Sequence, residues 1–156
     1  MPVSSSLIRW LLAYGRARDA AICPGRPYAL RGEVIRGFGR GKQLGIPTAN
    51  IRCDDQLICA DGVYAARCRL DGTSYPAALS IGSLPTFEQQ NHQVEAHLIG
   101  FDGDLYGRTI EIEVLDYLRE QRKYDGVEPL MAQIGRDLEK VRQEADVDPA
   151  RPIAAA

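Results

Sequence analysis

D-G-V-Y-A-A-R-C-R-L-D-G, residues 61–72, is a short run of near-alternating polarity that begins and ends with an Asp-Gly dipeptide. Asp-Gly pairs readily adopt the backbone conformations that tight turns between strands require. Short runs near period two extend over residues 28–117, and Asp102-Gly103 supplies a further turn signal. Regular spacing of this kind favours an antiparallel barrel or sandwich. We therefore expect this central region to be mainly β.

Helical patterns are expected on both sides of the β region. Near the N-terminus, the serines at 4–6 offer N-caps for an apolar stripe that ends at Gly15. After Asp125 the apolar period returns to that of a long helix, whose stripe is predicted to face the core. The members of this second stripe are Val127, Leu130, Met131, Ile134, Leu138 and Val141.

The length of 156 residues suits one domain that can bury a core without disulfide staples. We expect a helical connector-like segment at 1–27, a main domain at 28–145 and a loose tail at 146–156. The net charge of −2 argues against a general nucleic-acid or membrane-surface binder, which would carry a basic excess. Any anion site must then be local.

Cysteine usage indicates the compartment. Cys23, Cys53, Cys59 and Cys68 form no C-x-x-C pair, and no histidine lies at metal-motif spacing from them, so zinc is not expected. Buried free thiols in a reducing cytosol are the simpler explanation. The first twelve residues contain only a short apolar run, interrupted by Arg9 and without a cleavage pattern. We expect a soluble, cytoplasmic protein with no membrane partner.

The stretch R-G-F-G-R-G-K-Q-L-G-I-P-T-A-N, residues 36–50, has the character of a phosphate and metal site. Glycines let consecutive backbone N–H groups turn toward an anion. Thr48 and Asn50 lie two apart, so in an extended segment their oxygens point to one face, and Mg²⁺ takes oxygen ligands. Neither the Walker A loop nor the dinucleotide fingerprint fits. A Gly-rich hairpin loop with solvated Arg and Lys side chains remains the alternative.

A second candidate lies in Q-V-E-A-H-L-I-G-F, residues 93–101. Strand alternation places Glu95 and His97 on one face, where a carboxylate beside an imidazole can serve as a general base or form an exposed pair. The following D-G-D-L-Y-G is expected to be a turn that leads into another strand. Asp102 and Asp104 are interpreted as turn-forming residues, in preference to a second metal site.

Several motifs occur in an order and spacing that resemble riboflavin kinases. They are the 36–50 stretch, G-V-Y-A from Gly62, S-I-G-S-L-P-T-F from Ser80, V-E-A-H-L from Val94, D-L-Y-G from Asp104 and Y-L-R from Tyr117. The resemblance covers about residues 28–142. The opening S-S-S-L-I-R-W-L-L to G-R-P-Y is similar to the connector that precedes the kinase module in bacterial bifunctional FAD synthetases.

This resemblance implies a six-stranded antiparallel Greek-key barrel with a long C-terminal helix and a short N-terminal helix. The implied activity is phosphorylation of riboflavin to FMN, with ATP as the second substrate and Mg²⁺ as cofactor. It implies small-molecule partners and no nucleic acid, and it allows a separate FAD synthetase module as a partner. The chain alone is expected to form FMN but not FAD, since the residues before the barrel contain no nucleotidyl-transfer motif.

The resemblance also implies roles for individual residues. Glu95 would be the catalytic base that accepts the proton of the terminal ribityl hydroxyl. Thr48 and Asn50 would hold Mg²⁺ and the nucleotide phosphates, and Arg119 would bind the flavin. The phosphates would be covered by a loop that contains Gly37, Gly39, Arg40, Gly41, Lys42 and Gly45.

The chain departs from the family pattern at a few positions. Family members often have an acid where Gly100 stands, Asn where Ser80 stands, and L-R-x-E-x-x-F where this chain has Gln121 and Tyr124. The changes at Gln121 and Tyr124 concern the flavin loop and leave the metal and base positions intact. Two alternatives to a standalone riboflavin kinase are a catalytically weak flavin- or nucleotide-binding module and the excised kinase half of a bifunctional synthetase.

Overall fold

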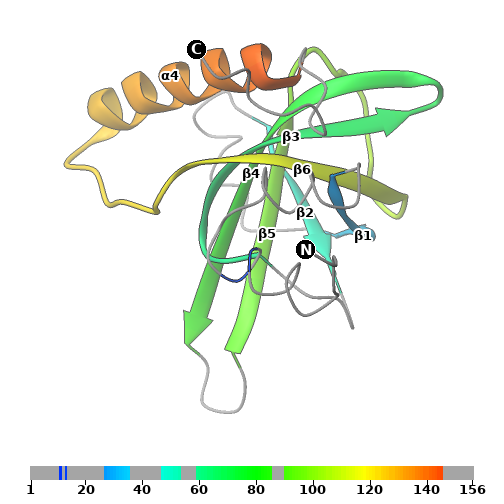
Figure 1. Cartoon of the computed structure of the whole chain (residues 1–156), viewed down its shortest axis with the longest axis horizontal. Coiled ribbons are helices and arrows are strands. Elements are labelled where there is room, and N and C mark those ends of the chain that lie inside the picture. The colour runs from blue at the N-terminus through cyan, green and yellow to red at the C-terminus, as the bar shows by residue number, and fades with distance from the viewer. Residues whose placement is uncertain are drawn as a thin grey trace, which may run out of the picture.

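The computed structural model describes residues 11, 13, 27–35, 47–53, 59–85 and 90–145. Within these residues, six strands form a closed barrel in the order β1-β2-β5-β4-β3-β6, and every neighbouring pair is antiparallel (Figure 1). Because β2 pairs with β5 while β3, β4 and β5 follow one another, the arrangement is a Greek key. The predicted barrel is therefore confirmed. The strands are β1 (Tyr28–Ile35), β2 (Ala49–Arg52), β3 (Gly62–Leu70), β4 (Thr73–Pro85), β5 (Gln90–Leu98) and β6 (Thr109–Arg119).

The three Asp-Gly signals differ in what they form. Asp71 and Gly72 have φ angles of 51° and 83° and join β3 to β4 as a two-residue hairpin turn. Gly62 instead opens β3, and Gly103 lies in the longer connection between β5 and β6. Only the first of these dipeptides is thus a tight hairpin, although all three mark strand boundaries.

Strand alternation fills the barrel with apolar side chains. Leu11, which is helical, also packs into this core and is 5% exposed. Leu11 and Ala13 are the described part of the predicted opening helix, and the rest of that segment and the predicted tail lie outside the described residues. Among the described residues, the largest fully buried side chains of this core are Tyr64, Leu30, Leu79, Ile81, Ile112, Val114, Cys59 and Cys68.

Helix α4 (Val127–Ala145) confirms the predicted long C-terminal helix and packs across β3, β4 and β6. Val141 is buried against Ala65 and Leu115 on the outer face of the barrel. The prediction that the whole stripe faces the core is wrong at its N-terminal end, because Val127 and Met131 are 58% and 37% exposed. A helix that lies on a convex barrel meets it along only part of its length.

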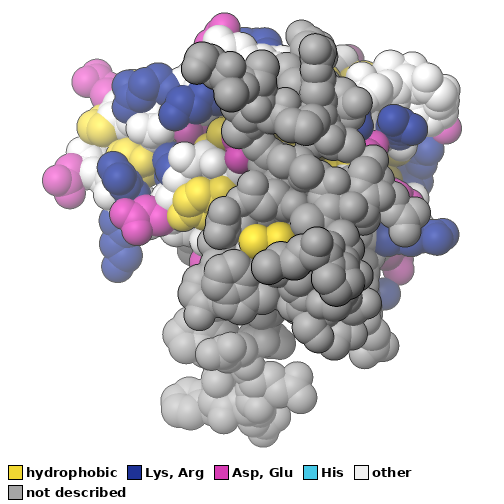
Figure 2. Space-filling view, viewed as in Figure 1, with side chains coloured by type: hydrophobic (Ala, Val, Ile, Leu, Met, Phe, Trp, Pro, Cys, Tyr) yellow, Lys and Arg dark blue, Asp and Glu magenta, His cyan; other side chains and the backbone are white. Residues whose placement is uncertain are grey.

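The surface in Figure 2 shows hydrophobic side chains among charged ones at the end of the molecule where α4 begins. Basic and acidic side chains are interspersed on the described part of this face. No helix among the described residues combines the length and hydropathy needed to cross a membrane.

Candidate active site

Strands β2 and β5 place Asn50 and Glu95 side by side. Asn50 is directly opposite Glu95 in the antiparallel register, and Glu95 is in turn opposite Ser80 of β4. The neighbours of Glu95, Val94 and Ala96, are buried in the barrel core, so Glu95 lies on the outer face. Directly opposite side chains have Cβ atoms about 4.5–5.5 Å apart. The residues expected to serve as metal ligand and base are thus neighbours.

The carboxylate of Glu95 is held by its own strand. Gln93 Nε2 donates a hydrogen bond of 2.6 Å to Glu95 Oε1, and both residues are half-buried. Because they lie two apart on β5, both side chains are on the outer face of the barrel. This contact orients the carboxylate, and an ionised carboxylate can accept more than one hydrogen bond.

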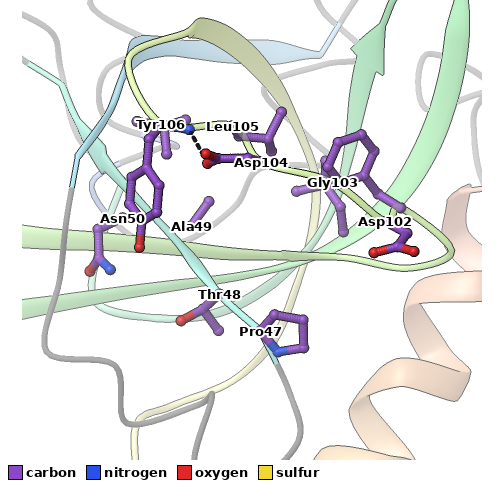
Figure 3. A pocket seen from close by; sticks show the side chains of 12 residues that line it. Pro47, Thr48, Ala49, Asn50, Asp102, Gly103, Asp104, Leu105 and Tyr106 are labelled. Atoms are coloured by element: carbon purple, nitrogen blue, oxygen red, sulfur yellow. Dashed lines mark hydrogen bonds between the residues drawn. The ribbon is translucent and has the colours of Figure 1, made fainter.

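Beside Asn50 lies a cleft of about 470 Å³, within the usual size range of small-molecule sites. Thr48 and Asn50 line one wall and project toward the same side of the chain (Figure 3). The remaining wall is largely apolar and includes the segment that follows β5. Its lining residues are Val34, Leu98, Phe101, Asp102, Gly103, Asp104, Leu105 and Tyr106.

A network of hydrogen bonds, two between backbone groups and one to a side chain, fixes the segment 104–108 at the cleft. Tyr106 N donates to Asp104 Oδ1 at 2.9 Å (Figure 3), and Arg108 N donates to Leu105 O at 3.0 Å. Gly107 N then donates to Val34 O on β1 at 3.0 Å. The Asp104 carboxylate therefore caps a turn, which confirms its interpretation as a turn-forming residue. This turn holds Tyr106, 57% exposed, at the cleft.

The sequence reasoning did not identify the apolar wall of the cleft. Phe101, Leu105 and Tyr106 resemble the ordinary apolar residues that flank strands. The D-L-Y-G motif next to a turn was the one signal in the sequence for this wall. The motif lies at the same cleft as Thr48 only because the strands close into a barrel. Conversely, the glycine-rich loop that the sequence singled out, Gly37, Gly39, Arg40, Gly41, Lys42 and Gly45, lies outside the described residues.

Arg119 is the last residue of β6, and its guanidinium is engaged with α4. Its Nη2 lies 2.8 Å from Oδ2 of Asp137, and the two side chains are only 16% and 5% exposed. Gln133 Nε2 donates to the same carboxylate at 2.9 Å, and the ring of Tyr124 lies 5.8 Å from the guanidinium carbon. The ion pair joins the end of the barrel to the helix. The predicted flavin contact of Arg119 stays a prediction.

The connection after Arg119 is also tied to the barrel through Gln121. Its Nε2 lies 2.8 Å from Ser80 Oγ and 3.1 Å from the carbonyl oxygen of Ile81. Two of the positions at which the chain departs from the family pattern are therefore in direct contact. Because Ser80 is opposite Glu95, this contact lies next to the strand pair that carries the candidate base.

The described residues contain no group of three or more His, Cys, Asp or Glu side chains placed to hold a metal ion. Thr48 and Asn50 offer neutral oxygens instead, and these suit a hard cation that takes most of its ligands from water and phosphate. The site thus consists of a cleft with one polar wall and, beside it, the oriented carboxylate of Glu95.

Fold and cleft together define an antiparallel barrel domain with a cleft of small-molecule size beside the β2–β5 strand pair. The family model for riboflavin kinase matches residues 24–145. The chain therefore belongs to the riboflavin kinase family of enzymes.

One similar protein and one similar solved structure carry riboflavin kinase in their descriptions. It is 37% identical over 142 residues to a bifunctional riboflavin kinase/FMN adenylyltransferase from Listeria monocytogenes, covering 90% of this chain and 45% of the relative. A riboflavin kinase structure from Trypanosoma brucei is 28% identical with a TM-score of 0.55, covering 74% of this chain and 77% of that one. A Streptococcus pneumoniae structure described as a macrolide-efflux protein is 34% identical with a TM-score of 0.86, covering 90% and 46%. The chain thus spans about half the length of the bifunctional relatives it matches.

Proposed function

We propose that this chain transfers the γ-phosphate of ATP to the terminal ribityl hydroxyl of riboflavin and so forms FMN. The observation that carries the proposal is the in-register pair of Asn50 and Glu95 beside a cleft that Thr48 and Asn50 line on one side. The pair sits in a chain whose family is that of riboflavin kinases. The same two positions were selected from the sequence as metal ligand and catalytic base.

ATP is assigned to the cleft. Its phosphates would lie at Thr48 and Asn50, while its base and sugar would pack on the apolar wall near Leu105 and Tyr106. The glycine-rich loop, residues 36–46, runs directly into Pro47 and would supply backbone N–H groups to the phosphates. When bound, Mg²⁺ would neutralise phosphate charge, with Thr48 Oγ1 and Asn50 Oδ1 as its protein ligands.

Glu95 is assigned to the acceptor hydroxyl. The hydroxyl oxygen bonds to the γ-phosphorus, the bond from that phosphorus to the bridging oxygen breaks, and ADP leaves. The hydroxyl proton passes to the Glu95 carboxylate. Because phosphoryl transfer leaves little covalent work for the protein, positioning and charge neutralisation supply most of the rate enhancement. A positioned base typically contributes a factor of about 10²–10⁴.

The flavin is assigned to the outer face near the start of α4. Val127 and Met131 leave apolar surface exposed there, and Arg119 ends β6 at the same junction. An aromatic ring system would cover such a surface, and a planar guanidinium suits stacking or a ring oxygen. The exposed apolar surface supports this flavin position, whereas the Arg119 guanidinium is paired with Asp137 and only 16% exposed, so its flavin contact stays a prediction.

Incubation with riboflavin, ATP and Mg²⁺, followed by chromatographic separation of the flavins, tests the proposal. FMN and ADP should form in equal amounts, and omission of ATP or addition of a chelator should stop both. A catalytically weak binding module would bind riboflavin or nucleotide without FMN formation. That result would replace the kinase proposal with the alternative.

A further inference from the structure

His97 is hydrogen-bonded to the backbone immediately before the proposed metal ligands. Its Nδ1 lies 2.7 Å from the carbonyl oxygen of Pro47. A carbonyl oxygen can only accept a hydrogen bond, so Nδ1 carries the proton in this contact. His97 is two residues beyond Glu95 on β5 and is half-buried, so both side chains lie on the outer face of the barrel.

The contact lies just before the first residue of β2 that pairs with β5. The register of β2 with β5 includes Ala49 opposite Ala96, and β2 itself begins at Ala49. Pro47 has no backbone N–H, so it cannot donate to a ladder that would continue in this direction. Thr48 therefore stands between a proline and the first ladder residue. The side chain of His97 therefore adds a hydrogen bond to the Pro47 carbonyl just beyond the last paired residues of β2 and β5.

Holding Pro47 O also orients Thr48. The carbonyl of Pro47 and the nitrogen and Cα of Thr48 share one rigid peptide plane. A donor fixed on β5 therefore sets the direction from which the Thr48 side chain leaves the backbone. Figure 3 shows Pro47, Thr48 and Asn50 in sequence along the cleft.

We propose that His97 is a positioning residue, whose Nδ1–H holds the Pro47–Thr48 peptide so that the Thr48 hydroxyl lines the nucleotide cleft. In the sequence, the glycine-rich stretch is followed directly by Pro47, whose carbonyl oxygen takes part in this contact. His97 acts through Thr48 and does not touch the reacting atoms. The inference rests on the proposed kinase function for the identity of the ligand.

A matched pair of variants isolates the donor. In His97→Asn, the side-chain Nδ2 is as many bonds from Cα as Nδ1 of histidine, so a donor remains in nearly the same place. His97→Leu has the same branched shape without a donor. The loss of one neutral hydrogen bond corresponds to a factor of about 3–10 in an equilibrium constant. His97→Leu should weaken binding of Mg²⁺ with a non-hydrolysable ATP analogue by about that factor, while His97→Asn should stay within about twofold of the parent.

The steady-state readout should follow the same split. His97→Leu should raise the KM for ATP more than the KM for riboflavin, and His97→Asn should restore the parent value. A purely structural role would change both KM values together and would follow the thermal midpoint of each variant. Equal ATP affinity in the Asn and Leu variants would overturn the proposal.

A measurement on the parent protein does not depend on whether a variant folds. Nitrogen NMR of the imidazole should show neutral His97 protonated at Nδ1, whereas the Nε2–H tautomer would overturn the inference. The proposed kinase function is tested separately by FMN formation in the parent. If no FMN forms, the nucleotide-analogue affinities and the tautomer still decide the role of His97.

Discussion

Glu95 faces Asn50 across the pair β2–β5 and accepts a hydrogen bond from Gln93, so a substitution here can separate shape from proton acceptance. Glu95→Gln keeps the size of the side chain and an oxygen for Gln93, but it removes the group that takes the proton. We expect FMN formation to fall by about 10²–10⁴-fold. Single-turnover assays should show this loss while riboflavin and Mg-ATP affinities remain near those of the parent. Near-normal turnover would rule out Glu95 as the base.

Thr48 and Asn50 can be tested by replacing each oxygen with a methyl group of similar size. Thr48→Val and Asn50→Leu should each weaken Mg-ATP binding, because hard cations do not bind methyl groups. Thr48→Ser and Asn50→Asp retain an oxygen and serve as controls. Calorimetry should show the loss in the first pair and a smaller change in the second. Unchanged affinity in the folded Val and Leu variants would mean that the ligands are elsewhere.

The spacing of these residues was visible in the sequence, but their neighbourhood was not. Thr48 and Asn50 share a face because they lie two apart in extended chain. That Asn50 stands opposite Glu95, however, is set by the register between two strands far apart in the chain. The same is true of the contact from His97 to Pro47, since a hydrogen bond between distant segments has no local sequence signal.

Gly32 of β1 lies so close to β2 that the barrel leaves no room for a side chain there. A Cβ atom at this position would lie 2.2 Å from the carbonyl oxygen of Arg52 on β2, and backbone cannot move aside cheaply. Gly82 of β4 is a matched control, because a Cβ there would meet nothing within 4 Å. We expect Gly32→Ala to destabilise the fold by about 1–3 kcal/mol, as overpacking does. Gly82→Ala should be neutral or stabilising by up to about 1 kcal/mol. Urea unfolding of both variants measures the difference, and equal stability would contradict it.

The junction of β6 and α4 depends on the ion pair of Arg119 and Asp137. Removing one partner leaves the other charge buried, which typically costs about 3–5 kcal/mol. Arg119→Ala and Asp137→Asn should therefore both lower the free energy of unfolding, as measured with urea. The Asn variant should lose less than the Ala variant, because its partner is the more exposed guanidinium and a hydrogen bond can remain.

The same two variants address the flavin. Arg119→Ala is predicted to impair riboflavin binding more than nucleotide binding, while Asp137→Asn breaks the ion pair but keeps the guanidinium. Titration of riboflavin fluorescence should show the larger loss in the Ala variant. Equal losses would instead assign the effect to the position of the connection between β6 and α4.

For the secondary-structure elements, the sequence predicted where each type of element forms more accurately than which of its residues are buried. The apolar period after Asp125 located α4 correctly. It did not reveal that Val127 and Met131 are exposed, because periodicity reports one face of a helix and not the extent of the surface against it.

For the whole molecule, spacing of turn signals left a barrel and a sandwich both open, and the resemblance to a family selected the barrel. What decides between them physically is the pairing of the first strand with the last, β1 with β6, in a register from Tyr28 opposite Val114 to Glu33 opposite Thr109. Closure removes exposed sheet edges and creates the apolar interior that buries Cys59, Cys68 and Tyr64.

Because these side chains are buried, the stability of the barrel changes with pH in the alkaline range. Burial raises the pKa of the Cys59 thiol from 9.0 to about 12 and that of the Cys68 thiol to about 11, and it also raises the pKa of the Tyr64 phenol. Above about pH 9 the unfolded thiols release protons that the folded protein keeps. The unfolded state then binds fewer protons, so the free energy of unfolding must fall as pH rises.

We therefore expect a plateau of this contribution below about pH 8 and a steady loss of stability from pH 9 to about 12. Urea unfolding under reducing conditions at a series of pH values measures the slope. Cys59→Ala lowers stability at every pH through the cavity it creates, but it should make the alkaline slope shallower because one buried proton is removed from the balance. The slope, and not the midpoint, is thus the diagnostic quantity. An unchanged slope in Cys59→Ala would show that this thiol already ionises inside the folded barrel. A parent stability curve that is flat between pH 8 and 10 would show the same for Cys59, Cys68 and Tyr64 together.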